Sequence, residues 1–181
     1  GAPSLAAAHA PARFVKYPWP AQDARYAVLW DRGEAGDLLL AGGEPLVTLH
    51  TPGHSPDHVA FWHEPSRTVF TGDLVAEGPS VMIHWSGGGD LGQYLQALER
   101  VLALRPRLLL PAHGPEVTDP ATLLNGYLDH RRMRERQVIE ALAFGRETVE
   151  SIAESIYHGI DPVLMPAALE NVRAHLEKLR T

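Results

Sequence analysis

The stretch "TPGHSPDHVAFW", residues 51–62, decides the fold, because it places a Pro-Gly corner between two apolar runs. The run before it, "LVTLH", and the run that ends it, "HVAFW", are predicted to be strands joined by a tight turn. Two interpretations of the polar side chains compete. His54 and His58 could only stabilise the turn by hydrogen bonds, or one of them could be a metal ligand whose partners lie further along the chain.

Composition limits the classes of function. The chain has 181 residues, a net charge of −6 and no cysteine. Any metal must therefore be bound by His, Asp or Glu side chains. A general nucleic-acid-binding surface is not expected, because it requires an excess of basic charge. We expect no membrane span, since no apolar run approaches the ~18 residues that one needs. The absence of cysteine fits a cytoplasmic protein.

Further apolar runs extend the predicted sheet in both directions. Upstream strands are predicted at residues 27–30, 37–40 and 45–50, and a hairpin joins residues 58–62 to residues 68–72. Residues 91–104 have apolar positions at helical spacing, with Asp90 as a plausible N-cap, and residues 107–114 form a strand that ends in a turn. A short helix is predicted near the N-terminus, at Ser4–Ala10.

The character of the sequence changes at Asp119-Pro120, a pair that typically begins a helix. One long helix is predicted from there to Phe144, followed by a second helix capped by Thr148 and a third over residues 167–180. We therefore predict an α/β domain over residues 1–118 and a helical domain over residues 119–181. The third helix is expected to pack on the α/β part through its apolar stripe (Leu169, Val172, Leu176 and Leu179).

Three turns at predicted strand ends carry side chains that bind metals. They are "TPGH" with His54, "FTGD" with Asp73 and "PAHG" with His113. Each turn alone is weak evidence, because His and Asp beside Gly or Pro often only stabilise turns. The repeated pattern of strand, corner and ligand predicts that the three side chains converge at one edge of the sheet. Two imidazoles and a carboxylate suit zinc, and also iron or manganese.

"TLHTPGHSPDHVAFW", "TVFTGDLV" and "LLLPAHGP" together resemble the metallo-β-lactamase superfamily of hydrolases. The C-terminal stretches "DHRRMRERQVIEAL", "TVESIAESIY" and "NVRAHLEKL" resemble the β-lactamase-like protein 2 branch, which has a winged-helix-like domain. The resemblance implies an α/β chain, the C-terminal part of an αββα sandwich followed by a small helical winged-helix-like domain. It implies that His54 binds a first zinc ion, Asp73 bridges two ions and His113 binds the second. It also implies hydrolysis of a small-molecule ester, thioester, lactone or phosphodiester by a metal-bound hydroxide.

The chain departs from that family in one respect. The signature H-x-H-x-D-H, which supplies most of the remaining ligands and a catalytic aspartate, is absent. We therefore expect this chain to carry only part of the site, to bind zinc weakly and to hydrolyse little, as a portion of a longer enzyme. Open apolar sheet surface would favour association, for example as a homo-oligomer. The alternative is a non-catalytic interaction module that keeps the scaffold.

Other features allow a functional and a structural interpretation. Asp57 and His58 are expected to support the site rather than to bind metal, and the Gly-rich residues 84–90 resemble a flexible loop near the family's metal site. Arg131, Arg132, Arg134 and Arg136 could contact RNA, but a solvated helix face paired with acidic residues is favoured. Residues 121–181 hold 8 Lys and Arg against 9 Asp and Glu, so nucleic-acid binding is not the preferred function.

Overall fold

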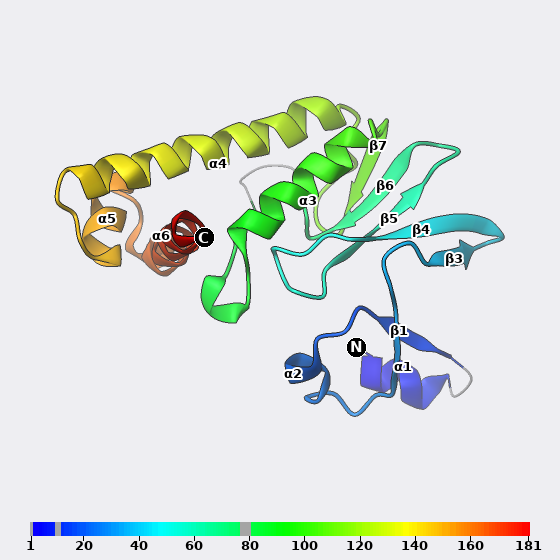
Figure 1. The fold of residues 1–181 in the computed structure, drawn as a ribbon. Coiled ribbons are helices and arrows are strands. Elements are labelled where there is room, and N and C mark those ends of the chain that lie inside the picture. The colour runs from blue at the N-terminus through cyan, green and yellow to red at the C-terminus, as the bar shows by residue number, and fades with distance from the viewer. Residues whose placement is uncertain (1, 10–11, 77–80) are drawn as a thin grey trace.

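The computed structural model describes residues 2–9, 12–76 and 81–181. It contains a five-stranded sheet, which lies on the right in Figure 1. The strand order is β3-β4-β5-β6-β7. Neighbouring strands from β3 to β6 are antiparallel, whereas β7 is parallel to β6. The strands are β3 (Leu38–Ala41), β4 (Glu44–His50), β5 (Val59–His63), β6 (Thr68–Gly72) and β7 (Leu108–Pro111).

One face of the sheet is buried under α3 (Leu91–Ala103), which connects β6 to the parallel strand β7 (Figure 1). A helical crossover of this kind is what a parallel strand pair requires. Asp90 caps the helix as predicted, because its side chain accepts a hydrogen bond from the backbone N–H of Gln93. The shared core is formed by buried apolar side chains of the sheet (Ala60, Trp62, Val69 and Leu109) and of α3 (Leu91, Tyr94, Ala97, Leu98 and Val101).

Three helices follow the sheet: α4 (Pro120–Ala143), α5 (Val149–Ile156) and α6 (Met165–Arg180). The predicted caps Asp119 and Thr148 both accept backbone hydrogen bonds at the helix starts. The first half of α4 belongs to the sheet core through Leu124, Tyr127 and Leu128. Its second half joins α5 and α6 in a separate cluster, formed by Val138, Ala141, Ile152, Ala153 and Val172. Helix α4 contributes side chains to both cores, so the packing does not separate two domains at its start. The domain boundary near residue 118 therefore stays a prediction.

The expected packing of α6 was wrong in its main part. Val172, with Leu169 and Leu176 beside it, lies in the cluster with α4 and α5 rather than on the sheet. Ala174 is the residue of α6 that enters the sheet core. The apolar stripe therefore holds the three helices together, and Leu179 at its end is 40% exposed.

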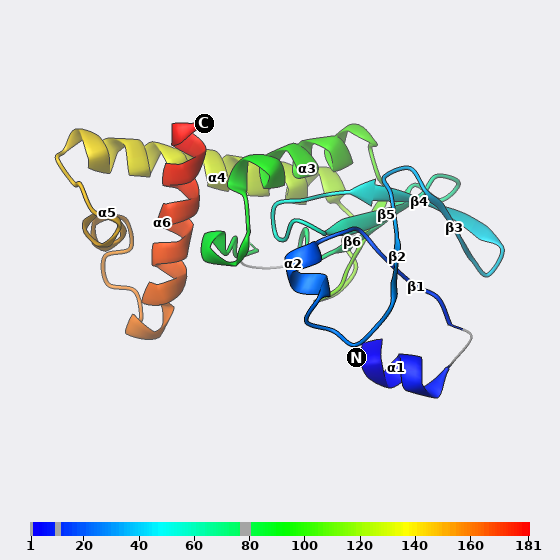
Figure 2. The same ribbon diagram turned by 60° about the horizontal axis from the view of Figure 1, so that its bottom comes forward.

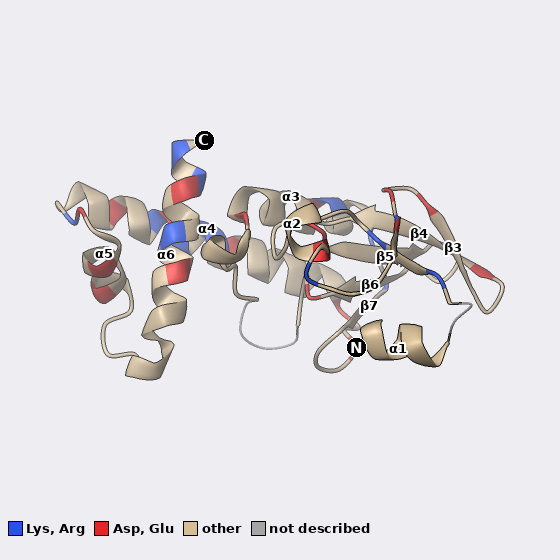
Figure 3. Cartoon of the chain, turned by 90° about the horizontal axis from the view of Figure 1, so that it is seen from below, with Lys and Arg blue, Asp and Glu red and all other residues tan. Residues whose placement is uncertain are grey.

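The arginines of α4 correct a second expectation. Arg131 is 1% exposed and stacks on the ring of Tyr94, so it is not part of a solvated face. Arg134 is half-buried against Tyr157, whereas Arg132 is exposed and pairs with an acidic neighbour on the same helix. Basic and acidic residues are interspersed along α4 and α6 (Figure 3).

The N-terminal segment contains α1 (Ala2–Ala8), β1 (Phe14–Lys16), α2 (Pro20–Asp23) and β2 (Trp30–Arg32), and it lies beside the sheet (Figure 2). The predicted strand at residues 27–30 was wrong. Strand β2 begins only at Trp30 and pairs in parallel with β1, while Leu29 is 95% exposed. The predicted N-terminal helix exists but ends at Ala8, and residue 10 lies outside the described residues. No described helix is long and apolar enough to cross a membrane.

Gly53 lets the β4–β5 turn touch the start of α3. Its φ of +133° is in a region that favours glycine, and an added Cβ would lie 2.3 Å from the Cα of Tyr94. The carbonyl oxygen of Gly53 also accepts a hydrogen bond from the N–H of Asp90, at 2.8 Å. The turn and the helix are therefore in direct backbone contact.

We expect Gly53→Ala to lower the free energy of unfolding by roughly 2–4 kcal/mol, through backbone strain and overpacking. Gly126→Ala is the matched control, because Gly126 is in α4 with no atom within 4 Å of an added Cβ. That change should stabilise the protein by up to about 1 kcal/mol. Urea unfolding measures both, and equal stability of the two variants would contradict the packing described here.

Candidate metal centre

The directions of three strands bring the predicted ligands together. β4 and β6 are both antiparallel to β5, and β7 is parallel to β6, so β4, β6 and β7 run the same way. The residues that follow them meet at one edge of the sheet. His54 follows β4, Asp73 follows β6 directly, and His113 lies two residues after β7.

Asp73 lies between the two imidazoles. Its Oδ2 atom is 4.0 Å from Nε2 of His54, and its Oδ1 atom is 3.4 Å from Nε2 of His113. All three side chains reach solvent, with exposed fractions of 31% for His54, 43% for Asp73 and 81% for His113. Each oxygen of one carboxylate therefore faces a different histidine.

This arrangement contains two ligand pairs rather than one cluster. Among the described residues, no three or more His, Cys, Asp or Glu side chains gather closely enough to hold one metal ion. Two ligand atoms bound to one tetrahedral zinc at roughly 2.1 Å stand about 3.4 Å apart. The spacing of His113 and Asp73 matches that value, and the wider spacing on the His54 side requires a small closing movement. The chemistry of these donors suits a metal ion, and Asp73 provides one donor atom on the side of each histidine.

The ring of His54 is oriented by the backbone. Its Nδ1 atom lies 3.3 Å from the carbonyl oxygen of Met82. A carbonyl can only accept, so Nδ1 is the donor in this contact, and Nε2 is the ring nitrogen that faces Asp73. A hydrogen bond from the second ring nitrogen is the usual way in which a metal-binding histidine is oriented.

His58 supports the backbone of Asp73. Its Nε2 atom accepts a hydrogen bond from the backbone N–H of Asp73 at 3.0 Å. Its Nδ1 atom lies 2.8 Å from Oγ1 and 3.1 Å from the carbonyl oxygen of Thr51. Burial, and then the neighbouring His54, lower the pKa of His58, which favours this neutral form. Gly72 leaves room for the ring, because an added Cβ would lie 2.8 Å from its Nε2.

Asp57 has a structural role at the outer side of the turn. Its carboxylate pairs with Nζ of Lys16 at 2.6 Å and accepts a hydrogen bond from Oγ of Ser55 at 2.7 Å. Burial opposes ionisation, but these hydrogen bonds outweigh it and lower the pKa of Asp57. The turn is thereby tied to the N-terminal segment. The sequence carried no signal for Lys16 in this role, nor for the carbonyl oxygen of Met82.

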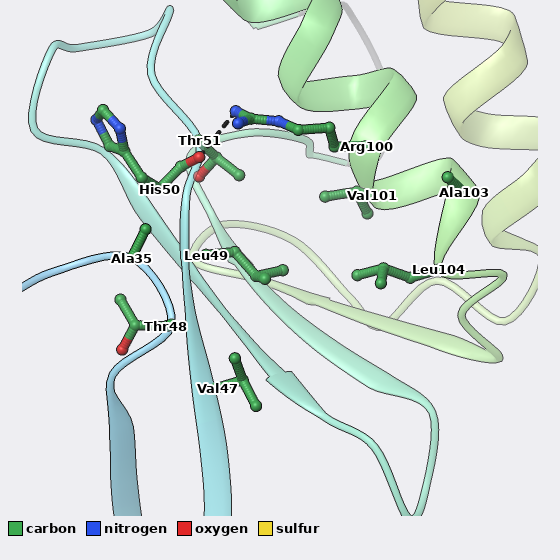
Figure 4. A pocket seen from close by; sticks show the side chains of 11 residues that line it. Ala35, Val47, Thr48, Leu49, His50, Thr51, Arg100, Val101, Ala103 and Leu104 are labelled. Carbon is green, nitrogen blue, oxygen red and sulfur yellow. Dashed lines mark hydrogen bonds between the residues drawn. The ribbon is translucent and has the colours of Figure 1, made fainter.

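An apolar cavity of about 390 Å³ lies nearby but belongs to another part of the molecule (Figure 4). It opens between β4 and the end of α3, with Val47, Leu49 and Leu104 among its lining residues. The side chain of Arg100 donates to the carbonyl oxygen of His50 at its rim. None of the three predicted ligands lines this cavity, so the candidate centre is the exposed edge around Asp73.

Sequence comparisons place most of the chain in known families. Residues 3–113 match the model of the Metallo-beta-lactamase superfamily, and residues 148–181 match the Beta-lactamase associated winged helix domain. The Beta-lactamase-like protein 2 homolog of Drosophila melanogaster is 32% identical over 76% of this chain and 46% of its own length. An Atrochrysone carboxyl ACP thioesterase of Aspergillus chevalieri is 32% identical over 77% of this chain and 48% of its own length. The chain spans about half the length of these curated relatives.

Solved structures share the fold. A metallo-beta-lactamase family protein from Thermus thermophilus superposes with a TM-score of 0.72 at 22% identity, covering 91% of this chain and 55% of that one. The protein TTHA1623, solved in a di-iron-bound form, superposes with a TM-score of 0.55 at 28% identity, covering 71% of this chain and 67% of that one. Together with the sequence matches, these likenesses show that the chain belongs to the metallo-beta-lactamase superfamily and carries a C-terminal winged helix domain.

Proposed function

We propose that this chain carries part of the centre of a metal-dependent hydrolase. The observation that supports the proposal is the position of Asp73, whose two oxygens face His54 on one side and His113 on the other. A carboxylate in this position can bind two ions at once. Zinc is the first candidate because of the His and Asp donors. Iron is a second candidate, since a relative of the same fold was solved with two iron ions, and manganese suits such donors as well.

In this proposal some residues of the chain would bind the ions and others would position the ligands. His54 and His113 would each hold one ion, and Asp73 would bridge the ions and offset part of their charge. His58 would fix the backbone of Asp73, and Met82 would keep the ring of His54 turned toward the carboxylate. When bound, the metal would supply Lewis acidity toward a substrate oxygen and would activate water at neutral pH.

The substrate class follows from what such a centre attacks. Esters, thioesters, lactones and phosphodiesters all present a polarisable oxygen beside a leaving group. Among these, we place acyl thioesters first, because one relative is named as a thioesterase. Pocket shape and loops determine the choice of substrate within a fold.

The ligand count predicts that the chain binds metal weakly by itself. A catalytic zinc usually has three protein ligands and one water. Here each proposed ion has two ligands, and Asp73 belongs to both. We therefore expect slow or no turnover by this chain. A non-catalytic interaction module remains the competing function, and it predicts no metal binding at these residues.

Zinc titration of single variants tests the proposal. His54→Ala and His113→Ala should each weaken zinc binding by at least about tenfold, and Asp73→Ala should weaken it most, because it serves both ions. His158→Ala is the control, since His158 is exposed in the C-terminal helical region. Isothermal calorimetry supplies the affinities, and a thiol-release assay with an acyl thioester shows whether turnover follows them. If all four variants bind zinc alike, the proposal fails.

A second prediction concerns His58. His58→Ala removes the acceptor for the N–H of Asp73 and should lower zinc affinity by about 10-fold, without removing a ligand. His63→Ala is the matched control, because His63 is at the far end of β5 and also hydrogen-bonds a nearby side chain, Ser66. The role assigned to His58 would be refuted by a folded His58→Ala variant with the zinc affinity of the wild type.

A further inference from the structure

The segment Val81–Asp90 lies between the turn that carries His54 and the C-terminal helices. On the side of the turn it makes two hydrogen bonds. The carbonyl oxygen of Met82 accepts from Nδ1 of His54 at 3.3 Å, and the N–H of Asp90 donates to the carbonyl oxygen of Gly53 at 2.8 Å. The same short segment therefore contacts the ring of His54 and the backbone of its turn.

On its other side the segment is held by two charged residues of the helices. The guanidinium of Arg131 in α4 donates to the carbonyl oxygen of Val81, the residue before Met82. The carboxylate of Glu170 in α6 accepts hydrogen bonds from both the backbone N–H and the hydroxyl of Ser86, each at 3.0 Å. Two helices far along the chain thus fix the segment at two points.

Arg131 is buried, so its charge does not serve to keep the surface soluble, and its role must lie in the contacts it makes inside the protein. The side chain is 1% exposed, lies over the ring of Tyr94 and donates to Oδ1 of Asn171 at 3.2 Å. Within the described ranges it forms no ion pair with a carboxylate. Burying a guanidinium costs free energy, and apolar residues of similar volume often stabilise such positions at least as well. Its hydrogen bonds to Asn171 and to Val81 are what an apolar residue could not provide, and the one to Val81 reaches the segment.

We propose that Arg131 and Glu170 are positioning residues for His54. They hold the segment Val81–Asp90 so that the carbonyl oxygen of Met82 faces the ring and keeps Nε2 turned toward Asp73. The C-terminal helices thereby act on the candidate centre without contacting it. This inference rests on the proposed function only in treating His54 as a ligand, because the orientation of the ring is a property of the metal-free chain.

The tautomer of His54 tests the inference without metal. Long-range ¹H–¹⁵N spectra of the metal-free chain in mildly alkaline buffer should show the proton of His54 mainly on Nδ1. Arg131→Gln and Glu170→Ala should each shift His54 toward a mixture of tautomers. Arg134→Gln is the matched control, since Arg134 is on the same helix and stacks on Tyr157 at 4.3 Å, away from the segment. It should leave the tautomer unchanged even where it lowers the thermal stability.

Zinc affinity is the second measurement. Arg131→Gln should weaken zinc binding by about 10-fold, as is typical when a group that orients a ligand is lost, and Arg134→Gln should not. If Arg131→Gln does not fold, Glu170→Ala provides the test instead, because it leaves the buried cation in place. Folded Arg131 and Glu170 variants with the tautomer and affinity of the wild type would overturn the inference. Failure of His54→Ala to weaken zinc binding would instead refute the proposed function, and the tautomer would still report on the positioning.

Discussion

The common direction of β4, β6 and β7 is the constraint on which the candidate centre depends. It follows from the antiparallel pairing of β4, β5 and β6 and from the crossover through α3, which makes β7 parallel to β6. With any of these strands reversed, its ligand would lie at the opposite edge of the sheet. Because strand direction fixes these positions, three short turns far apart in sequence can form one centre.

Close backbone contact fixes the position of the turn that carries His54. The turn before His54 rests on the first turn of α3, where Gly53 leaves no room for a side chain. The backbone of Asp73 is held in turn by His58. His113 is exposed and His54 and Asp73 are partly exposed, so all three can reach solvent, while His58, which holds the backbone of Asp73, is also partly buried.

Buried ionisable side chains meet where α4 and α6 pack together. His175 of α6 is buried, and burial followed by the charge of Arg131 lowers the pKa of His175 to about 3. The imidazole is therefore neutral at neutral pH, while Arg131 interacts with polar groups and with the ring of Tyr94. The guanidinium of Arg131 also donates to the backbone carbonyl of Val81.

Much of the fold could be predicted because its signals are local. Caps at Asp90, Asp119 and Thr148 and the apolar periodicity between them defined the helices, and the corners beside His54, Asp73 and His113 indicated the shared edge. Local patterns could not place residues 27–30, since an apolar run forms a strand only when a partner strand is available. The burial of Arg131 and the packing of the α6 stripe were missed for a related reason. Both depend on which helix packs against the residues in question, and a local sequence pattern does not specify that neighbour.

The family assignment and the ligand roles rest on different grounds. Sequence matches over most of the chain establish the superfamily, while the roles of His54, Asp73 and His113 are proposed from their geometry. An anomalous difference map from zinc-soaked crystals, recorded at the zinc edge, tests those roles most directly. The account predicts zinc density on both sides of the Asp73 carboxylate, one peak within bonding distance of His54 and the other within bonding distance of His113. Zinc bound elsewhere, for example at the His63–Glu44 pair, with none at Asp73, would contradict it.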